Sequence, residues 1–306
     1  MSFALLDAPS PVRPRPPRSA LARQITYAHA GQSRPARALI RSVEALTGRP
    51  ALLRRLQGIE ADLDSGRDLW RVLMQRFGLR VEVLRGSLEA IPAEGPLVLV
   101  ANHPFGILDG LIMAHLLSAL RGDFRVMANQ VFARAEVVNR VILPVDFAGT
   151  PEAQAANLRT RAEAIRHLRG GGAVGIFPGG TVSTAARPFD AAMDPVWRGF
   201  TARMIERSGA TVVPIWFEGQ NSRLFQVVSH LSQSLRVALL MREFAARTDR
   251  AVPLVVGAPI SAETLRQQAS DGKQMMDFLR RKTYDLSPNP LDPTRLGHEF
   301  EEHYRR

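Results

Sequence analysis

The stretch Leu97-Val98-Leu99-Val100-Ala101-Asn102-His103-Pro104-Phe105-Gly106-Ile107-Leu108-Asp109-Gly110 decides the fold. Its first five residues form a short apolar run that is typical of a buried strand. Pro104 and Gly106 then interrupt the run, and Asp109 stands where the apolar positions take on a helical spacing. The stretch therefore predicts a strand that leads directly into a helix.

Two polar side chains of this stretch are placed for chemistry. His103 follows the predicted strand, and in open α/β sheets ligands bind at the carboxyl ends of the strands. Asp109 begins the predicted helix, where its carboxylate can hold one imidazole nitrogen as N–H. The other nitrogen can then act as a general base near neutral pH. The alternative is a plain helix cap at Asp109 and a structural histidine at His103.

Strand-like and helical patterns alternate beyond Gly78. The predicted strands cover residues 80–84, 97–101, 124–128, 142–147, 173–177, 211–217 and 253–257. The predicted helices cover residues 109–120, 151–169, 195–208, 222–235 and 261–269. This alternation predicts an α/β fold with a mixed, mostly parallel sheet flanked by helices.

Composition divides the chain into four parts. Residues 1–35 hold six prolines and predict a basic, proline-rich, disordered arm. Residues 36–78 predict amphipathic helices over 37–56 and 67–77, which either pack on the core or face a membrane. We expect the α/β domain over 79–286 and a loose tail over 287–306.

The positive charge is concentrated near the N-terminus. Residues 1–55 carry ten arginines and two acids, a net charge of +8 out of +11 for the whole chain. Arginine-rich segments bind anionic membranes or nucleic acids. No groove-reading motif accompanies the charge, so we expect an anionic membrane surface and no nucleic acid as partner. The sequence contains no run of 18 apolar residues, so we expect no helix that spans a membrane.

Other chemistries lack their sequence signals. Cysteine is absent, which excludes disulfides and thiolate metal sites. The seven histidines show no ligand spacing, so we expect no metal. A serine hydrolase would need a Gly-x-Ser-x-Gly elbow, and the sequence contains none.

Three ordered blocks resemble the glycerolipid acyltransferase family, the bacterial lysophosphatidate and glycerol-3-phosphate acyltransferases. The blocks are the His103 stretch, Phe177-Pro178-Gly179-Gly180-Thr181-Val182-Ser183, and an apolar run over 210–219 that contains Pro214. The resemblance covers about residues 80–260. The first block and Gly219-Gln220-Asn221-Ser222-Arg223-Leu224-Phe225 are similar to the hemolysin-like, lyso-ornithine-lipid acyltransferase branch.

The resemblance implies an enzyme of membrane lipid biosynthesis, peripheral at the cytoplasmic face of the inner membrane. It would move a fatty acyl group from acyl-ACP or acyl-CoA, a co-substrate rather than a bound cofactor, to the hydroxyl of a lyso-lipid. His103 would be the general base and Asp109 its orienter. Backbone N–H groups of the glycine-rich turn would stabilise the oxyanion. The substrate-binding candidates are Asn102, Phe105, Gly106, Gly179, Gly180, Thr181 and Asn221.

The chain departs from the family pattern at several positions. Five residues, rather than four, separate His103 from Asp109. Gly179 stands where the family places a Glu, and Val182 and Phe147 stand where it places phosphate-binding arginines. These changes favour a lyso-aminolipid acceptor, such as lyso-ornithine lipid. The alternatives are a 1-acyl-glycerol-3-phosphate acyltransferase that uses Arg140, Arg187 or Arg223, and a non-catalytic membrane-binding protein.

Overall fold

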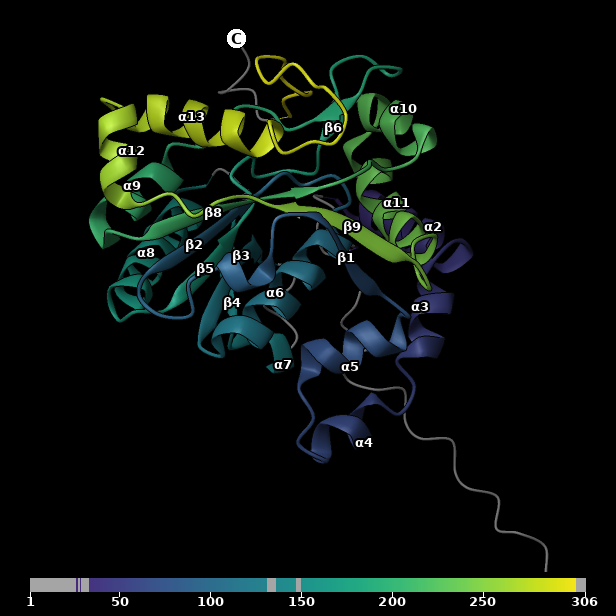
Figure 1. Ribbon diagram of the computed structural model, residues 1–306. Helices are drawn as coiled ribbons and strands as arrows, with labels where there is room; N and C mark the ends of the chain where they lie inside the picture. Colours follow the sequence, from purple (N-terminus) through teal and green to yellow (C-terminus); the bar gives the residue numbers. More distant parts are fainter. Residues whose placement is uncertain (1–25, 27, 29–32, 131–135, 147–149, 301–306) are drawn as a thin grey trace, which may run out of the picture.

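A computed structural model of the chain describes residues 26, 28, 33–130, 136–146 and 150–300 (Figure 1). Its centre is a seven-stranded sheet in the order β1-β9-β8-β2-β5-β3-β4. The strands are β1 Arg80–Arg85, β2 Leu97–Ala101, β3 Phe124–Asn129, β4 Ile142–Val145, β5 Ala173–Ile176, β8 Thr211–Phe217 and β9 Ala251–Val256. Only the β8–β9 pair is antiparallel. The predicted mixed, mostly parallel sheet is confirmed.

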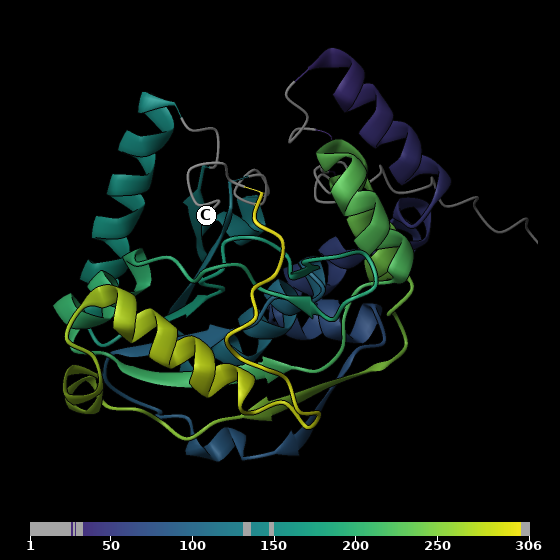
Figure 2. The same cartoon turned by 90° about the horizontal axis from the view of Figure 1, so that it is seen from above.

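Helices surround this sheet, and a small hairpin lies beside it. The helices are α2 Arg34–Leu46, α3 Arg49–Arg55, α4 Ile59–Asp64, α5 Leu69–Arg76, η2 Leu88–Ala90, α6 Ile107–Arg121, α7 Glu136–Asn139, α8 Pro151–Arg169, α9 Phe200–Ser208, α10 Arg223–Leu231, α11 Gln233–Ala245, α12 Ala262–Gln268 and α13 Gly272–Tyr284. The hairpin pairs β6 Thr184–Ala185 with β7 Ala192–Met193. Figure 2 shows α2 and α11 side by side, with α8 across the molecule from them.

Strand β2 is apolar at every position because helices cover both faces of the sheet. Leu97 and Leu99 lie in a core formed with α2, α3, α5, α6 and α11. Val98 and Val100 lie in a second core formed with α8, α9, α12 and α13. A parallel strand buried on both faces needs apolar residues throughout. This double burial explains why the apolar run 97–101 correctly predicted a buried strand.

Two predicted helices differ from those in the structure. The helix predicted over 195–208 begins only at Phe200, because Arg198 instead donates its backbone N–H to the carbonyl of Pro178 at 2.9 Å. The helix predicted over 222–235 is two helices. Ser232 adopts an extended conformation between them, and its side chain accepts a hydrogen bond from Leu235 N–H to begin α11.

Part of the C-terminal segment, where we expected a loose tail, is bonded to the rest of the fold. Residues 288–300 contain no helix or strand, but Gly297 N–H donates to the Asp194 carbonyl at 2.9 Å. His298 N–H donates to the Thr184 carbonyl at 3.0 Å. Glu299 forms a two-pronged ion pair with Arg198. These bonds attach the tail to the hairpin, a partner that no local pattern indicates.

Most of the predicted basic arm, and Phe147, lie outside the described residues. The N-terminal helical segment is present as α2 to α5, and α2 packs against α11. Within the described part of the chain, no helix combines the length and apolar character needed to cross a bilayer.

The structure predicts a pH-dependent stability through His167, near the end of α8. Burial lowers the pKa of His167, and the charge of Arg125 adds to this effect. The unfolded state therefore binds more protons than the folded state below about pH 6.5, and stability falls as the pH falls. We expect His167→Gln to flatten this slope by at most about 1.4 kcal/mol per pH unit.

Denaturant unfolding between about pH 5 and pH 7 measures this slope. Burial also lowers the pKa of His115, so His167→Gln should leave a residual slope. Identical slopes in the two proteins would contradict the assignment to His167.

Candidate active site

The structure brings the predicted His103 and Asp109 side chains together. Nδ1 of His103 lies 3.0 Å from Oδ2 of Asp109, although the two groups are not aligned for a straight hydrogen bond. The Asp109 side chain is fully buried, whereas that of His103 is 16% exposed. Catalytic hydrogen bonds are often poorly aligned before substrate binds. Since Nδ1 faces the carboxylate, Nε2 is the nitrogen that can accept a proton.

The local sequence fixes where Asp109 points. Asp109 is the third residue of α6, and its Oδ2 accepts hydrogen bonds from the backbone N–H groups of Phe105 at 2.8 Å and Gly106 at 2.9 Å. Gly106 has φ of 84°, a conformation that suits glycine. A Cβ there would also approach Val182 and Leu240 to 3.0 and 3.2 Å. Asp109 is therefore both a helix cap and the partner of His103, so the two interpretations are compatible.

The ring of His103 is held by stacking. It lies on the ring of Phe177 with centroids 4.1 Å apart and an interplanar angle of 25°. Phe177 directly follows β5, the strand next to β2 in the sheet. Two neighbouring parallel strands thus bring His103 and its stacking partner to the same edge of the sheet.

The backbone of His103 is held by a segment that sequence reasoning missed. Its N–H donates to Oδ1 of Asp194 at 3.2 Å, and its carbonyl accepts from Ser183 N–H at 2.8 Å. The Ser183 hydroxyl donates to the same Asp194 oxygen, and Trp197 Nε1–H donates to the other at 2.9 Å. Asp194 therefore connects the His103 loop to the loop that follows β5.

Asp194 is completely buried, and burial raises the pKa of its carboxyl. Its donors and the charge of Arg280 act in the opposite direction. The Tyr284 hydroxyl also holds this segment, because it accepts a hydrogen bond from the Asp194 backbone N–H at 2.7 Å. The sequence carries one weak cue, an isolated acid between Met193 and the run Pro195-Val196-Trp197.

The glycine-rich turn after β5 differs in part from the predicted oxyanion site. Gly180 N–H donates to the Phe177 carbonyl at 3.0 Å, so the prediction of Gly180 as a free donor is wrong. This hydrogen bond lies within the turn, so the Gly180 N–H is not available to an oxyanion. Among the described residues, none accepts a hydrogen bond from the N–H of Gly179 or of Thr181. A Cβ on Gly179 would lie 3.2 Å from Cβ of Asp194, which explains a glycine at this position.

Arg236 of α11 is a second residue that sequence reasoning missed. Its buried guanidinium donates to Oγ1 of Thr181 at 3.0 Å and to the carbonyl of Val182 at 2.8 Å. It also lies over the ring of Phe300, with Cζ 4.2 Å from the centroid. A single charged residue within the apolar run 235–240 is the signal that could have found it.

Among the remaining predicted residues, Asn102 and Phe105 lie beside His103 in the chain, and Asn221 follows β8, the strand next to β2. The Asn102 amide is occupied by the backbone of Phe217, donating at 2.9 Å and accepting at 2.7 Å, and so joins the ends of β2 and β8. The Phe105 ring is buried under the guanidinium of Arg247, with Cζ 3.8 Å from its centroid. Asn221 is buried, and neither of its amide atoms has a hydrogen-bond partner among the described residues.

A buried amide without a partner needs an explanation, such as a water molecule or a ligand. The cap at the start of α10 is Ser222, whose hydroxyl accepts from Phe225 N–H at 3.2 Å. Asn221 is therefore not needed as that cap. Arg223 donates to the carbonyls of Phe189 and Asp190, while Arg140 and Arg187 are exposed.

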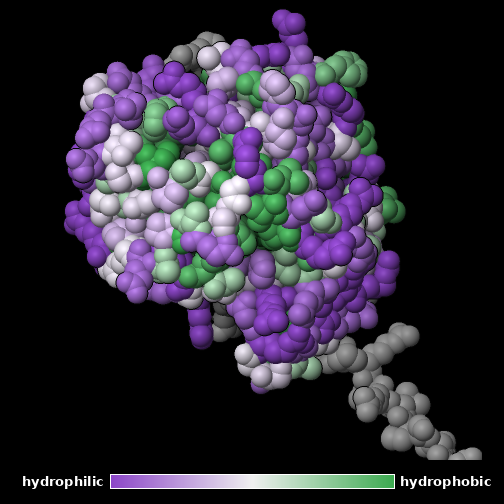
Figure 3. Space-filling view, in the orientation of Figure 1, coloured by the Kyte–Doolittle hydropathy of each residue, from purple (hydrophilic) through white to green (hydrophobic). Residues whose placement is uncertain are grey.

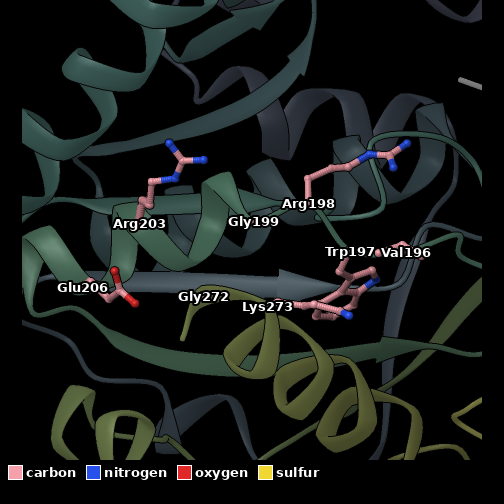
Figure 4. Close-up of a pocket in the computed structure, with 8 residues that line it drawn as sticks. All are labelled: Val196, Trp197, Arg198, Gly199, Arg203, Glu206, Gly272 and Lys273. Carbon is pink, nitrogen blue, oxygen red and sulfur yellow. The ribbon is translucent and has the colours of Figure 1, made fainter. Parts of the chain in front are cut away.

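Two cavities lie near this site without containing His103. One of about 390 Å³ lies behind the turn, and its wall includes Trp197, the donor to Asp194 (Figure 4). Its lining residues are Val196, Trp197, Arg198, Gly199, Arg203, Glu206, Gly272 and Lys273. Another of about 90 Å³ lies against Phe105, Leu108 and Arg247.

In the described residues no group of three His, Cys, Asp or Glu side chains fits a metal ion.

Comparison with known proteins gives three kinds of match. A family model described as acyltransferase matches residues 66–294. A lyso-glycine lipid O-acyltransferase of Phocaeicola vulgatus is 24% identical over 229 residues, which are 72% of this chain and 78% of the relative. One of Bacteroides thetaiotaomicron with the same name is 23% identical, over 72% of this chain and 80% of the relative.

Among solved structures, the crystal structure of the 1-acyl-sn-glycerophosphate (LPA) acyltransferase PlsC from Thermotoga maritima aligns with a TM-score of 0.46. It is 14% identical and covers 85% of this chain and 83% of that chain. The family model spans well over half of the sequence and includes both predicted blocks around His103 and Gly179. The chain therefore belongs to the acyltransferase family, and its predicted membership among the glycerolipid acyltransferases is confirmed.

Proposed function

We propose that this acyltransferase moves a fatty acyl group from an acyl thioester to the hydroxyl of a lyso-aminolipid. The donor would be acyl-ACP or acyl-CoA, and the enzyme would act as a peripheral protein at the cytoplasmic face of the inner membrane. The observation that carries the proposal is the 3.0 Å approach of His103 Nδ1 to the buried Asp109 carboxylate. This pair is a general base with its orienter.

The chemical step follows from this geometry. His103 Nε2 accepts the hydroxyl proton while the hydroxyl oxygen forms a bond to the thioester carbonyl carbon. Asp109 stabilises the resulting imidazolium. The tetrahedral oxyanion collapses, the carbon–sulfur bond breaks, and the thiolate takes the proton from the imidazolium. Thr181 and Gly179, whose N–H groups have no acceptor among the described residues, are the proposed oxyanion donors.

The acceptor proposal rests on the surroundings of the turn. Asp194 fills the space beside Gly179, where the family places a Glu, and Val182 is buried. Arg223 binds backbone carbonyls of the hairpin loop, so it is already engaged. A dianionic phosphate would lose more hydration here than an amide-linked head group. The relatives named lyso-glycine lipid O-acyltransferases support the same class of acceptor.

Asn221 is the proposed contact to the head group. Both its amide atoms are buried without partners among the described residues, so it can donate to and accept from an amide or carboxylate of a lyso-aminolipid. It follows the segment of Gly219, which contacts the Phe105 ring beside the His103 loop.

We expect His103→Ala to reduce turnover about 100- to 10,000-fold, the usual contribution of a general base. Asp109→Asn should cause a loss in the same range. Its amide oxygen can still accept from Phe105 and Gly106, while the NH₂ group can replace Oδ1, which has no described partner. The substitution therefore removes the charge and keeps the cap.

Steady-state assays with acyl donor and lyso-lipid, read by mass spectrometry, measure this loss. His167→Gln is the matched histidine control and should keep normal turnover. A folded His103→Ala protein with wild-type turnover would refute the mechanism.

Asp194 should act as a positioning residue. In Asp194→Asn the amide NH₂ must face either Trp197 or the His103 and Ser183 donors. At least one of the hydrogen bonds to this side chain is then lost, and the backbone of His103 is held less firmly. We expect kcat to fall about 10- to 100-fold with little change in KM for the acceptor. Trp197→Phe, which removes only one donor, should reduce kcat less. A loss of thermal stability with unchanged kcat would show that Asp194 only supports the fold.

We expect lyso-glycine and lyso-ornithine lipids to be acylated faster than lysophosphatidate. Asn221→Ala should reduce turnover of the aminolipids by about tenfold, the size of one hydrogen bond to a charged or polar group. Competition assays with mixed lyso-lipids measure the preference. A preference for lysophosphatidate that is lost on mutating Arg140, Arg187 or Arg223 would overturn the acceptor while leaving the acyltransferase reaction intact.

A further inference from the structure

Helix α10 exposes two of its leucines and buries two of its polar residues. Leu224 is 48% exposed and Leu231 is 76% exposed, whereas Gln226 and Ser229 are 0% and 3% exposed. In a helix packed on a soluble core, this distribution is normally reversed. The exposed face of α10 is therefore suited to an apolar environment.

Specific hydrogen bonds fix this orientation. The side-chain oxygen of Gln226 accepts from Ala185 N–H of the hairpin at 2.9 Å. The Ser229 hydroxyl donates to the Phe225 carbonyl at 2.6 Å. Phe225 itself is fully buried. Since the buried groups are engaged, rotation of the helix to hide its leucines would break these contacts.

The exposed apolar residues form one continuous stripe. Leu224, Val227, Val228 and Leu231 follow the spacing that places residues on one side of a helix, and the two valines are half-buried. Figure 3 shows apolar side chains at the upper right of the molecule, over the position of α10 in Figure 1.

The hairpin loop extends the stripe. Phe189, in the loop between β6 and β7, is 80% exposed. Arg223, at the start of α10, donates to the Phe189 carbonyl at 3.0 Å and to the Asp190 carbonyl at 2.9 Å, so the loop is tied to the helix. We call Phe189, Leu224, Val227, Val228 and Leu231 the α10–hairpin patch.

Two exposed arginines lie next to patch residues in the chain. Arg187 and Arg223 are exposed beside it, and Asp190, the acid in the loop, is paired with Arg295 at 3.1 Å. Apolar side chains rimmed by arginines are the composition of a surface that enters the boundary between anionic head groups and acyl chains.

The patch is continuous with the loops of the candidate site. The hairpin begins directly after the turn 179–183, and Asn221 directly precedes Ser222, the cap of α10. Arg236, which holds Thr181, lies on the next helix, and α10 and α11 pack together. The turn that holds the proposed oxyanion donors and the segment that holds Asn221 therefore both lead into the patch.

We propose that the α10–hairpin patch inserts into an anionic membrane and admits the lyso-lipid acceptor from it. Only the identity of the lipid that the patch admits rests on the proposed function. Insertion itself is measured without donor or turnover, so failure of either proposal can be recognised separately.

The absence of cysteine allows a direct test with the full-length chain. Leu231→Cys and Leu158→Cys each give one labelling site for an environment-sensitive fluorophore. Leu158 is 62% exposed on α8, and Figure 1 shows α8 on the opposite side of the molecule from α10. With phosphatidylcholine–phosphatidylglycerol vesicles, we expect a blue shift of emission at position 231 and none at position 158.

Binding of unlabelled variants gives the second measurement. The double variant Leu224→Ser, Leu231→Ser should reduce vesicle partitioning about tenfold or more, an effect that persists at high salt because it is apolar. Arg187→Ala should weaken binding only to anionic vesicles and only at low salt. Leu158→Ser should bind like the wild type. Activity on a detergent-dispersed short-chain acceptor should stay unchanged in the double variant.

Three results would overturn the proposal. One is wild-type partitioning of the double variant, and another is an equal blue shift at positions 231 and 158. The third is a dimer, detected by light scattering without vesicles, that the double variant abolishes, because the patch would then bind a second copy of the chain.

Discussion

The candidate site depends on one buried carboxylate. Oδ2 of Asp109 accepts the N–H groups of Phe105 and Gly106 and lies 3.0 Å from Nδ1 of His103. The loop conformation, the start of α6 and the orientation of the imidazole are thus joined in a single group. Gly106 ends this loop in a positive-φ conformation that suits glycine. A change at this carboxylate would alter all three features together.

A second carboxylate performs the corresponding task for the backbone of His103. Asp194 reaches the His103 N–H and gathers Ser183 and Trp197 around itself, while it occupies the space beside Gly179. The family resemblance suggested that the loss of a Glu at position 179 changes the acceptor pocket. The structure adds that this glycine lies against a buried acid from another segment. A larger residue at position 179 would therefore collide with Asp194 unless Asp194 moved.

The same loops continue outward into the surface that faces lipid in our proposal. The turn after β5 leads into the hairpin, and the segment of Asn221 leads into α10, so the proposed oxyanion donors and the proposed head-group contact lie on the same pieces of chain as the apolar patch. Charge near the N-terminus and apolar contact at α10 would contribute to attachment in different ways, since salt screens the first and not the second.

The sequence by itself determined the seven main strands, the α/β class and the meeting of His103 with Asp109. These features are local: a strand buried on both faces is a continuous apolar run, and a helix that begins a few residues later can return a carboxylate to the strand end. Only the tertiary structure revealed Asp194, which is 91 residues from His103, the engagement of the Gly180 N–H, and Arg236 beside Thr181. It also decided which face of α10 is exposed. Buried polar groups must find partners, and those partners come from wherever the chain crosses, which hydrophobic periodicity does not encode.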